Sequence, residues 1–173
     1  MNHDSYTDAY IRDILVRYRT IAMVGASPNT SRPSYFAMKY LKQKGFRVIP
    51  VNPGQAGKEI LGERVYATLA DIEAPVEIVD IFRNAKDALP IAREAIRIGA
   101  KVVWMQLGVR NDEAAKLAED AELKVVMNRC PKIEYGRLSG ELGWAGVNSR
   151  RLSSQRPILG VKGVQHRVLG AKA

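Results

Sequence analysis

The chain has 173 residues, of which 27 are Lys or Arg and 18 are Asp or Glu, giving a formal net charge of +9 at pH 7. With 46% hydrophobic and 26% charged residues, its composition is average for a soluble globular protein, and its length predicts one domain with a sizeable core. No apolar run reaches the roughly 18 residues of a membrane span, and no signal peptide is visible, so we expect a cytoplasmic protein. A single cysteine, Cys130, excludes an internal disulfide framework and a cysteine zinc cluster.

The positive charge is concentrated at the carboxyl end of the sequence. Residues 1–141 carry 21 basic and 18 acidic side chains, whereas the last 32 residues carry six basic and no acidic ones. Gly and Pro are scattered through this end without any sustained period, which is typical of a poorly ordered tail. We therefore expect a globular domain over residues 1–140 and a basic tail over 141–173.

The first third of the sequence predicts helix, strand, loop and helix in turn. Apolar residues recur at helical spacing over 8–18, and the short apolar run 21–24 is typical of a strand covered on both faces. Gly25 and the small polar residues 26–32 form a loop, and Pro33 suits the first turn of the next helix. The apolar stripe of that helix is predicted to comprise Phe36, Ala37, Tyr40 and Leu41.

The same alternation continues to residue 135. Further strands are predicted over 46–51, 76–82, 101–107 and 123–127, with an irregular excursion over 59–66. Between them we expect a short helix capped by Thr68, a helix with Leu89, Ala92, Ala95 and Ile96 on one face, a helix capped by Asn111, and a final short helix from Cys130-Pro131. The fold class is therefore α/β: a doubly wound, Rossmann-like parallel sheet of about five strands between two layers of helices.

Ligands of such sheets bind at the carboxyl ends of the strands, near the point where the strand order reverses. The informative segment there follows the first strand. A glycine permits close approach of a backbone or ligand, and small hydroxyl residues then lead into a helix N-terminus, whose free N–H groups attract phosphate. Arg32 adds a guanidinium group suited to phosphate. The sequence thus predicts a phosphate-bearing ligand at this loop.

Two features argue against ordinary NAD as this ligand. The loop is Gly-Ala-Ser-Pro-Asn-Thr and lacks the second and third glycines of G-x-G-x-x-G. The end of the second strand is Val-Asn-Pro-Gly at 51–54, with no carboxylate for a ribose hydroxyl. A ligand with a phosphate on its ribose suits this composition, and NADP and coenzyme A (CoA) both qualify.

Five segments carry a resemblance to a known family: residues 23–28 (MVGASP), 51–54 (VNPG), 61–66 (LGERVY), 103–108 (VWMQLG) and 128–131 (NRCP). In order and spacing they resemble the small single-domain CoA-binding proteins, which are similar to the CoA-binding domain of the succinyl-CoA synthetase alpha subunit. The resemblance covers roughly residues 10–138.

The resemblance implies a set of CoA-binding residues at the strand ends. The phosphates would lie on the loop after the first strand, the nucleotide would be bordered by the ends of the second and third strands, and the end of the fourth strand would line the far side. The implied residues are Gly25, Ala26, Ser27, Pro28, Asn29, Thr30, Ser31, Arg32, Asn52, Pro53, Phe82, Arg83, Met105, Gln106 and Leu107.

No catalytic constellation or metal-ligand spacing is visible. Both histidines, His3 and His166, lie in the terminal segments. The acidic residues around the third strand (Asp71, Glu73, Glu77 and Asp80) are interpreted as scattered surface acids. Cys130 lies just before a helix start, where a thiolate is favoured, but a packed small side chain is the simpler interpretation.

The leading hypothesis is therefore a non-catalytic protein that binds CoA or an acyl-CoA. One alternative is an NADP-dependent enzyme or redox sensor, which would share the sheet and the loop. Another is a nucleic-acid-associated protein acting through its basic tail, although nucleic acid is the less favoured partner because the rest of the chain is nearly balanced in charge. No membrane association is expected.

Overall fold

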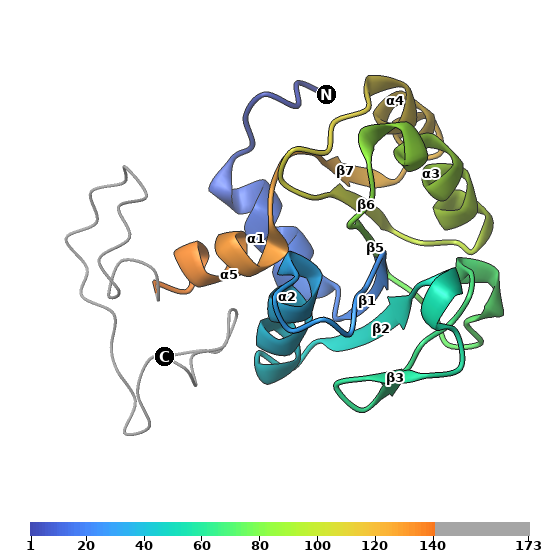
Figure 1. Ribbon diagram of the computed structural model, residues 1–173. Coiled ribbons are helices and arrows are strands. Elements are labelled where there is room, and N and C mark those ends of the chain that lie inside the picture. The colour runs from blue at the N-terminus through green and yellow to red at the C-terminus, as the bar shows by residue number, and fades with distance from the viewer. Residues whose placement is uncertain (141–173) are drawn as a thin grey trace.

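The computed structural model describes residues 1–140, which form a parallel five-stranded sheet between two helical layers (Figure 1). The predicted tail and His166 lie outside these residues. The strands are β1 (Thr20–Val24), β2 (Arg47–Val51), β5 (Ile78–Ile81), β6 (Val102–Met105) and β7 (Lys124–Val126), in the spatial order β2-β1-β5-β6-β7. All four neighbouring pairs are parallel. The predicted fold class is confirmed.

Helices cover both faces of the sheet because each face carries its own apolar cluster. The helices α1 (Asp8–Arg17), α2 (Pro33–Gln43) and α5 (Pro131–Leu138) bury residues in one cluster or pack against it, together with the buried Trp104. The helices α3 (Ala88–Arg97) and α4 (Asp112–Asp120) pack on the other face through alanines, six of which are at most 1% exposed. Small side chains let these helices approach the sheet closely.

The irregular segment after β2 has little regular structure. It contains the antiparallel pair β3 (Glu59–Ile60) and β4 (Glu63–Arg64). Within residues 1–140, three short 3₁₀ turns occur, at Pro53–Gln55, Leu69–Asp71 and Ala85–Asp87. The side chain and backbone of Thr68 both bond to Asp71, which starts the second of these turns as its capping pattern predicts. Asn111 caps α4 as expected, with its Oδ1 accepting from the N–H of Ala114 at 2.8 Å.

One detail of the predicted packing is wrong. Phe36, assigned to the apolar stripe of α2, is 50% exposed, whereas Met38 is fully buried. The buried face of α2 is therefore rotated toward Ser34, Ala37, Met38 and Leu41.

Within residues 1–140, β7 is an edge strand of the sheet, and tyrosine side chains bond to its outer backbone groups. The hydroxyl of Tyr10 donates to the carbonyl of Val125 and accepts from its N–H, both at 3.1 Å. The hydroxyl of Tyr6 accepts from the N–H of Met127 at 2.8 Å. These contacts block backbone groups that would otherwise be open to another strand. Within residues 1–140, no helix is long and apolar enough to cross a membrane.

Candidate functional site at the carboxyl edge of the sheet

The strand order reverses between β1 and β5, because β2 lies on one side of β1 and the later strands of the same sheet, β5, β6 and β7, lie on the other. In doubly wound sheets this is where ligands bind, at the carboxyl ends of the strands. We call the predicted residues at this edge, 25–32, 52–53, 82–83 and 105–107, the carboxyl-edge site.

Gly25 connects β1 to the loop in a conformation that other residues rarely adopt. Its φ is +91°, and its N–H donates to the carbonyl of Val51 at the end of β2. A Cβ added here would lie 2.4 Å from the carbonyl oxygen of Phe82 and 2.9 Å from Cδ of Arg83. The backbone after β5 therefore requires glycine at this position before any ligand is considered.

The loop after Gly25 is held by its own short polar side chains. Ser27 Oγ accepts from the N–H of Asn29 at 3.2 Å, and Oδ1 of Asn29 accepts from the N–H and hydroxyl of Ser31 at 2.9 and 2.7 Å. The N–H of Arg32 then donates to the carbonyl of Asn29. These bonds form a preorganised turn leading into α2.

The N-terminus of α2 follows this loop directly; Pro33 has no N–H, and the N–H groups of Tyr35 and Phe36 donate to the carbonyl of Arg32. An α-helix leaves its first N–H groups without intrahelical partners, and its N-terminus has a positive partial charge. Arg32 is the N-cap residue, but its side chain makes no capping hydrogen bond and is exposed. Pro28, Asn29, Thr30 and Ser31 are exposed as well, whereas Ala26 is 1% exposed and contributes only backbone.

Asn52 joins the loops that follow β1 and β2. Its Nδ2 donates to the carbonyl of Ala26 at 2.7 Å, and its Oδ1 accepts from the N–H of Gly54 at 3.0 Å. The amide thus occupies the place where a dinucleotide fold of the NAD type has a carboxylate. Pro53, beside it, is exposed.

The opposite side of the loop is formed by the residues after β5. Phe82 is half-buried, and its N–H donates to the carbonyl of Val24 at 2.8 Å, which extends the pairing of β1 with β5. The stem of Arg83 passes over Gly25, and its guanidinium group is 3.6 Å from Asp87. Arg32 and Arg83 therefore flank the loop with positive charge.

The three predicted residues at the end of β6 and just after it differ in accessibility. Met105 is fully buried in the face covered by α3 and α4, so its side chain is not presented at the surface. Leu107 is 55% exposed. Gln106 is 5% exposed, and its carboxamide is turned toward β5.

Asp80 corrects the interpretation of the acidic residues as surface groups. It is fully buried on β5, and Nε2 of Gln106 donates to its two carboxyl oxygens at 3.0 and 3.1 Å. Burial raises the pKa of Asp80 to about 8, against an opposing effect of the hydrogen bond from Gln106. Sequence reasoning missed this residue, although its position inside a strand expected to be covered on both faces was a usable signal.

The other acids have structural roles or are exposed. Oε2 of Glu77 accepts from the N–H groups of Arg19 and Thr20 at 2.8 and 2.9 Å, which fixes the start of β1. Asp71 belongs to the capping pattern described above, and Glu73 is exposed. In the described part of the chain, no cluster of three His, Cys, Asp or Glu side chains could hold a metal ion.

Cys130 is the N-cap residue of α5 and is 9% exposed. Burial raises the pKa of its thiol, so the thiolate is disfavoured. The geometry favours the interpretation of Cys130 as a packed side chain over that of a reactive thiol.

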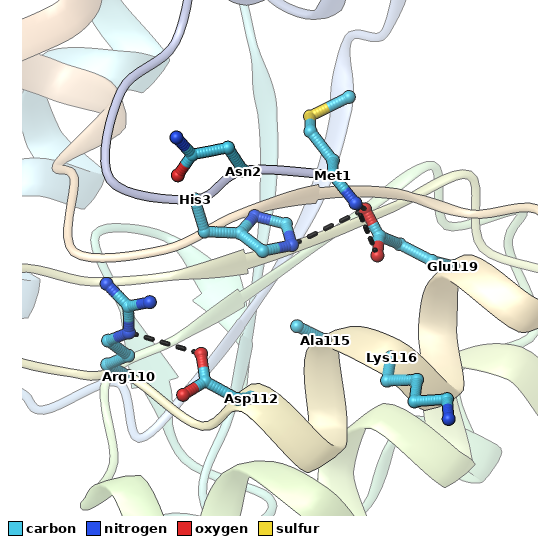
Figure 2. Close-up of a pocket in the computed structure, with 8 residues that line it drawn as sticks. All are labelled: Met1, Asn2, His3, Arg110, Asp112, Ala115, Lys116 and Glu119. Carbon is cyan, nitrogen blue, oxygen red and sulfur yellow. Dashed lines mark hydrogen bonds and ion pairs between the residues drawn. The ribbon is translucent and has the colours of Figure 1, made fainter.

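A separate pocket of about 350 Å³ lies between the N-terminal segment and α4. Figure 2 shows the His3 ring directed at Glu119, whose carboxylate also pairs with the Met1 ammonium group. None of the predicted site residues lines this pocket. His3 is therefore confined to a different part of the surface from the carboxyl-edge site.

Comparison with known proteins places the chain in a family. A model of the CoA binding domain matches residues 19–136. The chain belongs to this family. It is 34% identical over 127 residues to the uncharacterized protein YneT of Bacillus subtilis, covering 73% of this chain and 93% of that protein.

Solved structures agree with this assignment. A hypothetical protein from Pyrococcus horikoshii is 44% identical, with a TM-score of 0.75 over 80% of this chain and 96% of that one. A 29% identical segment of 116 residues also occurs in an ADP-forming acetate–CoA ligase of Archaeoglobus fulgidus, where it makes up 17% of the ligase and 66% of this chain. The predicted similarity to synthetase CoA-binding domains is confirmed.

Proposed function

We propose that this protein binds CoA or an acyl-CoA at the carboxyl-edge site and catalyses no reaction there. The observation that carries the proposal is the loop 25–32: a preorganised turn that leads into the N-terminus of α2 and is flanked by Arg32 and Arg83. Such a site suits a pyrophosphate, because backbone N–H groups, the helix dipole and guanidinium groups all favour negative charge.

The end of β2 supports CoA over NAD. The side-chain amide of Asn52 joins the loops that follow β1 and β2. The segment 51–54 contains no carboxylate, which in NAD-binding proteins binds the ribose hydroxyl and would repel a phosphorylated ribose. The ribose of CoA carries a phosphate. We therefore expect Asn52 and Pro53 to border the nucleotide, with Phe82 and Arg83 on the opposite side.

The ionisable groups near the site support binding without a catalytic step. A catalytic acid or base must reach the reacting atoms, yet Asp80 is fully buried and Cys130 is a packed thiol of raised pKa. His3 lies in the other pocket. Membership of the CoA-binding domain family and the matching segment of the acetate–CoA ligase give independent support for the ligand.

Thermal unfolding in the presence of different ligands tests this proposal. At 100 times its dissociation constant, a ligand specific for the folded state adds about 2.7 kcal/mol to the free energy of unfolding. We expect CoA to raise the unfolding midpoint in this way, and NADP and NAD at equal concentration to leave it nearly unchanged. A larger rise with NADP than with CoA would favour the NADP alternative instead.

A further inference from the structure

A carboxyl group lies in the core directly behind the carboxyl-edge site. Asp80 on β5 is aligned with Met23 on β1 and Trp104 on β6, and all three are fully buried on the face covered by α1, α2 and α5. Burying an acid among apolar side chains is unfavourable unless it is hydrogen-bonded. Within residues 1–140, its side-chain hydrogen-bond partner is Gln106.

This pairing fixes the orientation of the Gln106 carboxamide. Because its NH₂ group faces both carboxyl oxygens of Asp80, its Oε1 atom is directed elsewhere. Among the described residues, Oε1 of Gln106 accepts no hydrogen bond. Gln106 is 5% exposed and immediately follows β6 at the carboxyl edge, so this acceptor is available on the side where a ligand would bind.

We propose that Asp80 is a positioning residue, which holds Gln106 so that its Oε1 accepts a hydrogen bond from an amide N–H of the pantetheine arm of CoA. The inference rests on the proposed function and deepens it, because it assigns recognition of the arm to a buried pair separate from the phosphate loop. Asp80 itself touches no ligand.

Ionisation of Asp80 gives the pair a signature in pH. An ionised carboxylate only accepts hydrogen bonds, so it admits only the NH₂ group of Gln106. A protonated carboxyl group also donates, and it therefore tolerates the reversed amide, which presents NH₂ to the ligand. Burial raises the pKa of Asp80 to about 8. The contribution of the pantetheine arm to the affinity for CoA should therefore increase as pH rises through this value.

In the described part of the chain, the pKa of Asp80 is set by burial and by the hydrogen bond from Gln106. The neighbouring strands contribute the uncharged Met23 and Trp104. The segment that starts α5 contributes Cys130, whose charge interacts with that of Asp80, and Lys132 beside it. Burial raises the pKa of the Cys130 thiol, which moves its ionisation further from neutrality.

The test compares two ligands by titration calorimetry from pH 6.5 to 9. S-methyl-CoA carries the arm without an ionisable thiol, and 3′-phospho-ADP is the nucleotide part alone. The measured quantity is the affinity for S-methyl-CoA divided by the affinity for 3′-phospho-ADP. This ratio isolates the contribution of the pantetheine arm to binding. Asp80→Leu should lower this ratio about 3- to 10-fold, the equivalent of one neutral hydrogen bond, and should leave binding of 3′-phospho-ADP unchanged.

Asp80→Asn separates positioning from a structural role. Like the protonated acid, its side chain both accepts and donates, so the ratio should match the wild-type value at low pH and stay above that of Asp80→Leu, and its rise with pH should disappear. Should Asp80→Leu fail to fold, Gln106→Leu replaces it and should lower the ratio by the same factor.

An unchanged ratio in Asp80→Leu or Gln106→Leu overturns the inference while CoA binding itself stands. A pH dependence that survives in Asp80→Asn also overturns it, since the titrating group is then not Asp80. Failure of the wild-type protein to bind either ligand contradicts the proposed function, which is a distinguishable result.

Discussion

The buried carboxyl group of Asp80 makes the stability of the fold depend on pH. Its ordinary pKa is 3.8, and burial in the folded chain raises it to about 8. Below pH 4 both the folded and the unfolded chain hold this proton, so the free energy of unfolding suffers no loss from Asp80. Between pH 4 and pH 8 the unfolded chain releases the proton first, so the free energy of unfolding falls as pH rises.

The size of this effect follows from the pKa difference. Each pH unit inside the window lowers the free energy of unfolding by at most about 1.4 kcal/mol, and the slope vanishes as pH passes the folded-state pKa. From pH 6 to pH 8 the loss attributable to Asp80 is about 2 kcal/mol. Asp80→Asn has no proton to lose, so its stability should not follow this slope.

Urea unfolding at pH 6, 7, 8 and 9 measures the difference between the two proteins. The matched control is Asp120→Asn, which makes the same chemical change at an exposed position near the end of α4. The free energy of unfolding of the control should change with pH as that of the wild type does. Between pH 6 and pH 8, the free energy of unfolding of Asp80→Asn should rise by about 2 kcal/mol relative to the wild type. Parallel curves for wild type and Asp80→Asn would refute the assignment of a raised pKa to this residue.

Three further predictions concern the loop and the sheet edge. Arg32→Ala should weaken CoA binding by roughly 1.5–3 kcal/mol in a calorimetric titration, while Lys39→Ala, which removes an exposed cation further along α2, should have little effect; equal losses would mean a general charge effect. Gly25→Ala should destabilise the fold by about 1–3 kcal/mol in urea unfolding because its Cβ meets the carbonyl of Phe82, and wild-type stability would show that the loop can move aside. Tyr10→Phe should cost about 1–3 kcal/mol of stability, since two backbone groups of β7 lose their partner, and an unchanged urea midpoint would show that water replaces the hydroxyl.

Much of the architecture could be predicted because short apolar runs alternate with helical periodicity. The five strands lie where these runs occur, and the caps at Thr68 and Asn111 act through local hydrogen bonds that spacing reveals. The rotation of α2 that exposes Phe36 could not be predicted, because it depends on how the helix docks against α5 and the sheet.

The site was harder to predict because its contacts join segments distant in sequence. The bond from Asn52 to Ala26 depends on the register of β1 against β2, and the clash at Gly25 depends on the register against β5. The position of Asp80 inside a strand covered on both faces indicates burial, but the sequence does not show which side chain would partner it. Only the pairing of β5 with β6 brings it to Gln106.

The central claim is tested most directly by titrating ligand-free protein with CoA at low and high ionic strength, with NADP titrated in parallel. The account predicts saturable binding of one CoA per chain that weakens as salt screens the arginines beside the loop, and much weaker binding of NADP. Absence of saturable CoA binding at millimolar concentration, or equal affinity for NADP, would contradict it.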